Sequence, residues 1–308
     1  MTEEKQVRPP AAHWKLRTRT LALGPRTLVM GIVNITPDSF SDGGLYLDPA
    51  AAIARSMQWL DEGADLIDLG AESTRPGSQA GSSSDAEVSA DEEQARLLPV
   101  LEGVRKARPD AIVSVDTYKA ATARAALAAG AEIINDVSGF SWDDDLATVC
   151  AEAGCGVVLM HTRGRPDEWS TQPQLAPDDL LKAISSGLHS SLDRAAAAGI
   201  AADSIVLDPG YGFGKHGAEN FALLARQAEL LALGRPLLAG LSRKSFLGQA
   251  LAPLYGGKRA PVEARETASL AAMVAAVLNV ASIVRVHQVR AAVEAALVVD
   301  AIRQPAGE

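Results

Sequence analysis

Short apolar segments alternate with longer segments of helical periodicity along most of this chain of 308 residues. A strand followed by a helix, repeated many times, requires parallel pairing, and parallel strands are buried beneath helices. The pattern therefore predicts an α/β protein. Eight apolar segments have the length of a strand: TLVMGIV (27–33), ADLIDLG (64–70), AIVSVDT (111–117), AEIINDV (131–137), GVVLMHT (156–162), SIVLDPG (204–210), PLLAGLS (236–242) and SIVRVH (282–287).

Eight units of near-even length match the (β/α)₈ barrel. An open doubly wound sheet is the alternative that the same repeats allow. We expect a single (β/α)₈ TIM barrel over residues 27–303, an N-terminal extension over 1–26 and a short tail over 304–308. The extension is expected to form a hairpin around Gly24 and Pro25 that covers the barrel mouth opposite the functional rim.

Composition limits the partners of this chain. Aromatic residues make up only 4%, which favours aliphatic strands packed closely against alanine-rich helices. A formal net charge of -9 argues against nucleic-acid binding, because phosphate contacts need a concentrated basic face. The longest apolar stretch, 270–284, is too short and too interrupted to span a bilayer, and we expect a buried helix running into a strand. With no secretory signal and only Cys150 and Cys155, the sequence predicts a cytoplasmic protein without a membrane partner.

Polar residues stand where the apolar segments end. The carboxyl ends of the strands of a (β/α)₈ barrel meet on one rim, where the active sites of this fold are built. The sequence therefore places a candidate site on this rim. The rim residues expected here are Asn34, Glu72, Asp116, Asn135, Asp136, His161, Asp208, Ser242, Arg243, Lys244, Arg285 and His287.

Four of these residues indicate the kind of ligand. Asp116, Asn135 and Asp208 end three of the segments, and Lys244 follows the seventh. Each carboxylate taken alone is equally well explained as a cap of the following helix. Together, convergent carboxylate and amide groups in a dry pocket suit a flat heterocycle that has N–H donors and a carbonyl acceptor.

Arg285 and His287 are two positions apart at the end of the eighth segment, so strand alternation sends both to one side of the sheet. We expect Asn34 opposite them in the ring. An arginine, a histidine and an amide oxygen form a site for a diphosphate with Mg²⁺, since this ion prefers oxygen ligands and keeps several waters. His161, a single strand-end histidine, is more often structural than catalytic.

Three further stretches have less certain roles. SRKS (242–245) is either a solvated basic turn or a ligand contact, and its place on the rim of an acidic chain favours the contact. DPGYGFGKHG (208–217) lacks the first glycine and the hydroxyl residue of a nucleotide phosphate loop. GSQAGSSSDAEVS (77–89) is rich in Ser and Gly without an apolar pattern, which predicts a mobile loop.

These residues closely resemble the dihydropteroate synthase family over 28–293. Enzymes of this family join 6-hydroxymethyl-7,8-dihydropterin diphosphate to p-aminobenzoate, which gives 7,8-dihydropteroate for folate biosynthesis and releases pyrophosphate. The resemblance implies a TIM-barrel transferase with Mg²⁺ as cofactor, two small-molecule substrates and a homodimer formed through the C-terminal helices. The shared motifs occur in order: GIVNITPDSFSDGG, GAESTRPGS, SVDTYK, IINDVSG, LDPGYGFGK, SRKSFLG and RVH.

The resemblance also implies a role for individual residues. It assigns to the pterin Asp116, Asn135, Met160, Asp208, Phe213, Lys244 and Arg285. It assigns to the diphosphate Asn34, Arg75, Arg285 and His287, with Mg²⁺ on Asn34. It assigns to p-aminobenzoate Phe40, Asp42, Thr74, Pro76, Phe213, Lys244 and Ser245. The implied catalytic residues are Asn34, Asp116, Asp208, Lys244, Arg285 and His287.

The stretch NITPDSFSDGG (34–44) is interpreted as a catalytic lid that carries Phe40 and Asp42 over the second substrate. The STRPGS loop (73–78) is expected to close from the other side and to keep water from a reactive intermediate. Two features depart from the family pattern: Gln288 stands where aspartate is common, and the loop 77–89 is longer and richer in serine than usual.

Two alternative functions share the barrel and the acidic pterin pocket. A pterin-binding methyltransferase has no need of the SRKS and STRPG loops that clamp an arylamine. A non-catalytic pterin-binding protein is expected to have lost Asn34, Lys244 or His287, and all three are present.

Overall fold

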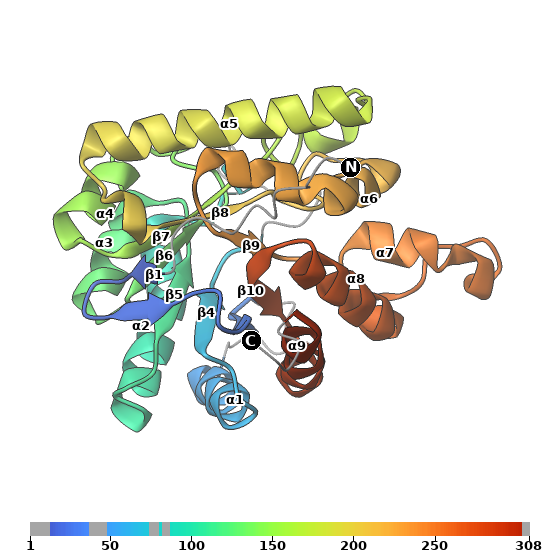
Figure 1. Ribbon diagram of the computed structural model, residues 1–308. Coiled ribbons are helices and arrows are strands. Elements are labelled where there is room, and N and C mark those ends of the chain that lie inside the picture. The colour runs from blue at the N-terminus through green and yellow to red at the C-terminus, as the bar shows by residue number, and fades with distance from the viewer. Residues whose placement is uncertain (1–12, 37–47, 74–79, 82–86, 304–308) are drawn as a thin grey trace.

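The computed structural model describes residues 13–36, 48–73, 80–81 and 87–303, and Figure 1 shows their arrangement. Eight parallel strands close into a barrel in the order β10-β3-β4-β5-β6-β7-β8-β9. Ile283 of β10 pairs with Leu28 of β3, so the predicted TIM barrel is confirmed and the open sheet is excluded. The strands are β3 (Leu28–Asn34), β4 (Leu66–Gly70), β5 (Val113–Asp116), β6 (Ile133–Asp136), β7 (Gly156–Met160), β8 (Ile205–Asp208), β9 (Leu237–Ala239) and β10 (Ala281–Val286).

Helices cover the outer face of the barrel (Figure 1). The side chains of Asp48 and Ser89 accept backbone N–H groups at the starts of the first two, as sequence-encoded N-caps do. The α-helices are α1 (Pro49–Asp61), α2 (Ala90–Ala107), α3 (Ala120–Ala128), α4 (Leu146–Ala153), α5 (Pro177–Ala198), α6 (Gly217–Arg226), α7 (Ser245–Ala250), α8 (Glu266–Leu278) and α9 (Val289–Arg303). Short 3₁₀ helices are η2 (Trp169–Thr171), η3 (Ala202–Ser204), η4 (Gln227–Leu233), η5 (Ala252–Tyr255) and η6 (Val262–Arg265).

The apolar stretch 270–284 is a helix followed by a strand, as predicted. α8 ends at Leu278, and β10 begins at Ala281. Among the described residues, no helix combines the length and the apolar character that crossing a bilayer requires.

A two-stranded antiparallel hairpin precedes the barrel and lies across its strands in the view of Figure 1. β1 (His13–Lys15) pairs with β2 (Thr20–Ala22). A hydrogen bond of 2.8 Å from Leu16 N–H to Arg19 O closes the turn between them. The predicted turn at Gly24-Pro25 is therefore wrong, because the chain reverses earlier.

The hairpin closes the N-terminal mouth of the barrel, and burial of its tryptophan explains where it folds. Trp14 is fully buried, and its indole N–H donates to the carbonyl of Ser204 at 2.9 Å. Trp14 and Leu16 join the apolar side chains of the lower barrel interior, which include Leu28 and Leu66. With one mouth filled by apolar side chains, the opposite rim is left for the site.

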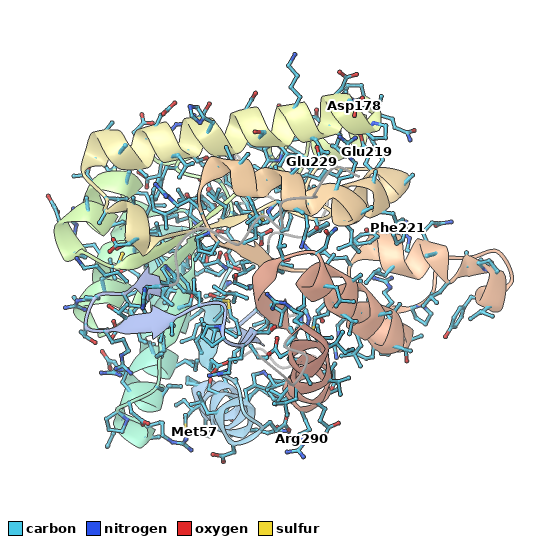
Figure 2. All side chains as sticks on the ribbon, in the orientation of Figure 1. Met57, Asp178, Glu219, Phe221, Glu229 and Arg290 are labelled. Atoms are coloured by element: carbon cyan, nitrogen blue, oxygen red, sulfur yellow. The ribbon has the colours of Figure 1, made fainter. Side chains whose placement is uncertain are left out.

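Side chains fill the space between the barrel and its helices, as Figure 2 shows. α7 projects from the side of the barrel next to α6 and α8 (Figure 1). Phe221 of α6 joins it to the body of the protein, since its ring meets Phe246 edge to face with centroids 5.1 Å apart. This contact fixes the start of α7, which follows the rim turn SRKS.

Candidate active site

Strand alternation inside the barrel positions the polar side chains of the site. An inward-facing apolar residue of the lower layer is followed two positions later by a polar residue on the same face. The lower layer is therefore apolar, and the polar layer above it faces the C-terminal rim. Such pairs are Leu66 and Asp68 on β4, Ile133 and Asn135 on β6, Val206 and Asp208 on β8, and Ile283 and Arg285 on β10.

Arg285 connects the members of this polar layer. Its Nε donates to Asp68 Oδ2 at 2.6 Å, and its Nη2 donates to Asp116 Oδ2 at 2.7 Å. Asn135 Nδ2 donates to the same oxygen of Asp68 at 3.0 Å. Asp68 is fully buried, and its Oδ1 has no hydrogen-bond partner among the described residues. One guanidinium thus holds two carboxylates from different strands in fixed positions.

Burial opposes ionisation of the carboxyl groups on the rim. It raises the pKa of Asp116 to about 7, although the charge of Arg285 acts in the opposite direction. It also raises the pKa of Asp208, even though Asp208 Oδ1 accepts the Gly210 N–H at 2.7 Å. Carboxylates in such dry surroundings gain most from a ligand that donates hydrogen bonds to them.

Lys244 lies over the aromatic ring of Phe213, with Nζ 3.8 Å from the ring centroid. Burial lowers the pKa of Lys244 to about 7, although the charge of Asp208 acts to raise it. Phe213 meets Trp169 edge to face at 5.0 Å and packs against the cluster that includes Met160. The site therefore combines acceptors with a flat apolar surface and a cation.

Lys215 holds the loop after β8 in place. This buried side chain donates from Nζ to the carbonyls of Gly210, His161 and Phe213 at 2.7, 3.1 and 3.2 Å. Gly210 has a φ of +71°, and a Cβ there would lie 1.9 Å from the His161 carbonyl oxygen, so only glycine fits. These contacts hold Phe213 against Lys244.

His287 is held by the turn after β9. Ser242 Oγ accepts the backbone N–H of His287 at 3.3 Å and lies 3.0 Å from its Nδ1. Asn34 ends β3, which pairs directly with β10. Asn34 is therefore beside the strand that leads to His287, and the expectation that it stands opposite in the ring is wrong.

Three rim residues form structural contacts in the described part of the chain. Glu72 forms an ion pair with Lys119. Asp136 accepts the backbone N–H of Phe140 at 2.5 Å, which braces the loop after β6. The backbone N–H of His161 donates to the Asp208 carbonyl at 3.0 Å, and burial lowers the pKa of the imidazole far below its ordinary value. The structural interpretation of the imidazole itself stays a prediction.

Two described residues of the serine-rich loop 77–89, Ala80 and Gly81, contact the body of the protein, while the mobility predicted for this loop stays a prediction. Ala80 is 2% exposed, and Gly81 N–H donates to Tyr118 Oη at 2.8 Å. A Cβ at Gly81 would lie 2.6 Å from the ring of Trp142, so the Gly81 backbone packs directly against this ring.

Several predicted residues lie outside the described ranges. These are Phe40, Asp42, Thr74, Arg75 and Pro76. The predicted lid and the STRPGS loop therefore stay predictions. Ser245, by contrast, is described as the first residue of α7, directly after Lys244.

Sequence reasoning missed Asp68 and Lys215. Asp68 stands two positions before the end of β4, so it is not among the residues predicted at strand ends. Its one signal was a charge inside the apolar segment ADLIDLG. Lys215 was considered only as part of a nucleotide motif, and the sequence carries no sign that its amine binds carbonyls of its own loop.

The family described as pterin binding enzyme matches residues 30–287 of this chain. The chain belongs to the pterin-binding enzyme family. The match runs from β3 through β10 and includes all described residues of the polar layer.

This pterin-binding enzyme is similar over most of its length to dihydropteroate synthases. It is 45% identical over 275 residues to dihydropteroate synthase of Mycobacterium leprae, which covers 89% of this chain and 92% of that relative. The structure of Xanthomonas albilineans dihydropteroate synthase with 4-aminobenzoic acid matches with a TM-score of 0.82 and 40% identity, covering 95% and 98% of the two chains. The same enzyme in complex with 7,8-dihydropteroate matches with a TM-score of 0.79 and 37% identity, covering 94% and 98%.

Proposed function

We propose that this pterin-binding enzyme is a dihydropteroate synthase, a transferase that joins 6-hydroxymethyl-7,8-dihydropterin diphosphate to p-aminobenzoate and releases pyrophosphate. The observation that carries the proposal is the polar layer, in which Arg285 binds Asp68 and Asp116 on a barrel rim that also presents Asp208 and Lys244. Synthases at 45% and 40% identity support it. One similar structure binds 7,8-dihydropteroate, the product of this reaction.

The pterin is proposed to bind in the polar layer. Its ring has N–H donors along one edge and a carbonyl acceptor, and Asp116 and Asp208 offer acceptors to the donors. Asn135 supplies an amide that both donates and accepts. Phe213 and Lys244 offer a flat surface and a donor. These side chains are therefore complementary to the heterocycle in hydrogen bonding, with an aromatic ring beside them.

Mg²⁺ is the cofactor that we propose, with Asn34 as its protein ligand. Among the described residues, no group of three or more His, Cys, Asp or Glu side chains could hold a metal. A single amide oxygen suits Mg²⁺, because this ion keeps several waters and binds through few protein oxygens together with substrate phosphates. The ion supplies positive charge to the diphosphate, and Arg285 and His287 add donors to the same group.

We propose that the bond between the methylene carbon and the diphosphate oxygen breaks before the amine attacks. The electron pair of this bond leaves with pyrophosphate, and the methylene carbon attached to the pterin becomes a carbocation. The amine nitrogen then forms the new bond and loses a proton to water. Asp116 and Asp208 favour the cation through their negative charge, and Arg285 and His287 stabilise the departing group. The arylamine is mostly neutral at pH 7, so no general base is required.

Isotope scrambling tests this stepwise order. The pterin diphosphate is labelled with ¹⁸O at the bridging position and incubated with enzyme, Mg²⁺ and an unreactive p-aminobenzoate analogue. Reversible ionisation is expected to move the label into non-bridging positions while the diphosphate stays bound. Retention of the label, together with a negligible α-secondary deuterium effect at the methylene carbon, would instead support direct displacement.

Pyrophosphate release tests the function itself. The purified protein with both substrates and Mg²⁺ is expected to release one pyrophosphate for each 7,8-dihydropteroate formed, and to form no dihydropteroate when p-aminobenzoate is omitted. Pterin binding without turnover would indicate a non-catalytic pterin-binding protein. Methyl transfer from a methylated folate to a corrinoid would indicate the methyltransferase. Either result contradicts the proposal.

Pterin affinity is expected to be greatest near neutral pH. Asp116 accepts charge-assisted hydrogen bonds on both oxygens when ionised, and its pKa of about 7 means that affinity falls as the pH drops below that value. Lys244 donates charge-assisted hydrogen bonds when protonated, and its pKa of about 7 means that affinity falls as the pH rises above it. Calorimetric titration with 6-hydroxymethyl-7,8-dihydropterin, which carries no phosphate, measures this between about pH 5 and about pH 9. A flat profile would show that neither group titrates in this range.

The Ser245→Ala variant is expected to raise the KM for p-aminobenzoate by about 10-fold, since a hydrogen bond to a charged group contributes about 1.5 kcal/mol. The hydroxyl is proposed to meet the substrate carboxylate, far from the bond being made, so kcat is expected to change little. Steady-state kinetics with each substrate varied measure the difference. Ser190→Ala on α5 is the control, because that hydroxyl bonds the Ser186 carbonyl of its own helix at 3.1 Å. An equal rise in both KM values contradicts the assignment.

A homodimer through α8 and α9 is part of the same proposal. Exposed apolar side chains on these helices support it, namely Leu278, Leu297, Val298 and Ile302. Light scattering is expected to give twice the chain mass, and Leu297→Glu is expected to give monomers. The cytoplasmic location predicted from the sequence belongs to this proposal as well.

A further inference from the structure

The rim turn 242–245 carries Lys244, Ser245 and the serine that holds His287, and its backbone is strained. Arg243 has a φ of +61°. This left-handed conformation is unfavourable for a residue that has a side chain, and such residues persist where their surroundings over-determine them. The question is therefore what holds Arg243 in place.

Three residues at the end of η6 and the start of α8 bind Arg243 from different sides. Ser269 Oγ accepts its backbone N–H at 2.9 Å. Arg265 Nη1 donates to its carbonyl at 2.9 Å. Its own guanidinium Nε forms an ion pair with Glu266. The N–H group, the carbonyl and the guanidinium of Arg243 are thus all bound by residues at one helix end.

The groups that bind Arg243 are themselves fixed. Arg265 is 8% exposed, and its Nε and Nη2 donate to the Ala260 carbonyl at 3.0 and 2.8 Å. The hydroxyl of Ser269 donates to the Arg265 carbonyl at 2.7 Å. A Cβ at Gly248 of α7 would lie 2.5 Å from Arg265 Nε, so α7 packs tightly on the same guanidinium.

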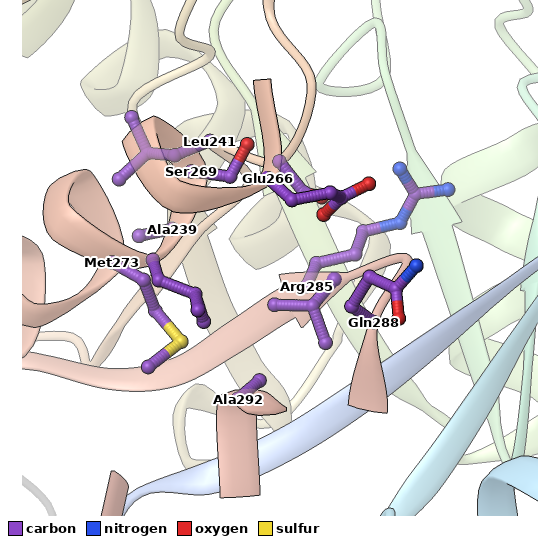
Figure 3. Close-up of a pocket in the computed structure, with 11 residues that line it drawn as sticks. Ala239, Leu241, Glu266, Ser269, Met273, Arg285, Gln288 and Ala292 are labelled. Atoms are coloured by element: carbon purple, nitrogen blue, oxygen red, sulfur yellow. The ribbon is translucent and has the colours of Figure 1, made fainter. Parts of the chain in front are cut away.

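A small pocket lies beside the turn (Figure 3). Glu266 and Ser269, which bind Arg243, line it, whereas Arg243 itself does not. The pocket opens between the end of the barrel and the helices α8 and α9. Its lining includes Leu241, Ser242, Glu266, Ser269 and Gln288.

We propose that Arg265, Glu266 and Ser269 form a clamp that positions Lys244 for the reaction. By holding Arg243 in its left-handed conformation, the clamp keeps the Lys244 ammonium over Phe213. None of the three clamp residues is assigned a contact with substrate, so they are positioning residues that act through the turn. The role in catalysis rests on the proposed function.

Substitution of Ser269 distinguishes the proposed positioning role from a contribution to helix stability alone. A buried helical serine commonly donates to the carbonyl four residues earlier, and Ser56 of α1 does so at 2.8 Å to Ala52. Ser269 makes the same bond to Arg265 and in addition accepts the Arg243 N–H. Ser56→Ala is therefore a matched control, since it removes the helix bond alone from another buried site.

The experiment compares Ser269→Ala, Ser269→Thr, Glu266→Gln and Ser56→Ala in the full-length protein. Ser269→Ala is expected to lower kcat by about 10- to 100-fold, the scale of a misplaced reacting group. Its thermal midpoint is expected to lie only a few degrees below that of Ser56→Ala, because it removes one further hydrogen bond. Ser269→Thr, which keeps the hydroxyl, is expected to retain activity. Glu266→Gln is expected to lower kcat by a smaller factor.

Hydrogen exchange provides a readout that does not depend on turnover. Mass spectrometry of the ligand-free protein is expected to show faster exchange in a peptide covering the turn for Ser269→Ala, and unchanged exchange there for Ser56→Ala. Equal kcat in these two variants, or unchanged exchange at the turn in Ser269→Ala, overturns the clamp. If the wild-type protein makes no dihydropteroate, the proposed function fails, while exchange at the turn still decides whether the clamp exists.

Discussion

The Asp208→Asn variant is expected to bind dihydropterin about 10- to 100-fold more weakly than the wild type. A hydrogen bond to a charged group contributes about 1.5 to 3 kcal/mol, and the amide also presents an N–H group to a donor on the ligand. The asparagine oxygen can still accept the Gly210 N–H that Asp208 Oδ1 accepts at 2.7 Å. The loop after β8 is therefore expected to keep its conformation.

The stability of the Asp208→Asn variant is not expected to fall with its affinity for dihydropterin. Burial raises the pKa of Asp208 above its value in the unfolded chain, so ionising this carboxyl costs stability once the pH exceeds the unfolded pKa. The neutral amide avoids that cost at pH 7, and the thermal midpoint is expected to stay equal or rise. Calorimetric titration and thermal unfolding measure the two effects. Asp203→Asn, at an exposed position near the other end of β8, is the control. Near-normal affinity in Asp208→Asn would refute the assignment.

The Arg285→Met variant is expected to lose both stability and activity. Removing one partner of a buried ion pair costs about 3 to 5 kcal/mol, because the remaining charge has no compensation. Here two carboxylates lose their partner, and Asp68 is fully buried. Activity is expected to fall by about 1000-fold or more, since the guanidinium is also proposed to stabilise the departing diphosphate. Urea unfolding and steady-state kinetics measure these losses.

The pH dependence of Arg285→Met identifies the cause of the lost stability. Burial already raises the pKa of Asp116 to about 7, and without the guanidinium that opposes this shift the pKa is expected to rise further. The stability deficit is then expected to be largest at alkaline pH and to shrink as the pH falls below about 7. Adding Asp68→Asn is expected to restore part of it. Arg290→Met, at an exposed residue of α9 (Figure 2), is the control, because a surface pair such as that with Glu294 contributes about 0 to 1 kcal/mol. A deficit independent of pH would contradict this account.

The fold could be predicted from the sequence because its signals are local. Each apolar segment predicts one strand, and each helical pattern predicts one helix. Parallel strands joined by helices can form only a few topologies. The hairpin turn was misplaced because Gly24-Pro25 is a strong turn signal. Its actual place depends on burial of Trp14 under the barrel, and that contact joins Trp14 to Ser204, distant in sequence.

The site was predicted in part for the same reason. Asp116 and Asp208 end their strands, and Asn135 and Arg285 stand one residue before the ends of theirs. The ends of parallel strands meet on one rim, so their grouping follows from the fold class. Asp68 was missed because its place in the polar layer depends on how β4 is aligned with the neighbouring strands. The bonds of Lys215 to carbonyls of its own loop were equally invisible in the linear sequence.

The sequence by itself determined the barrel, its polar rim and the residue types that suit a flat heterocycle and a diphosphate. Hydrophobic periodicity and strand ends are properties of consecutive residues, so no three-dimensional information is needed to read them. Only the tertiary structure decided which charges pair. Arg285 reaches Asp68 across 217 positions of sequence, because barrel closure places β10 next to β3 and near β4. The strained turn at Arg243 likewise depends on α8, whose Ser269 lies 26 positions further along the chain.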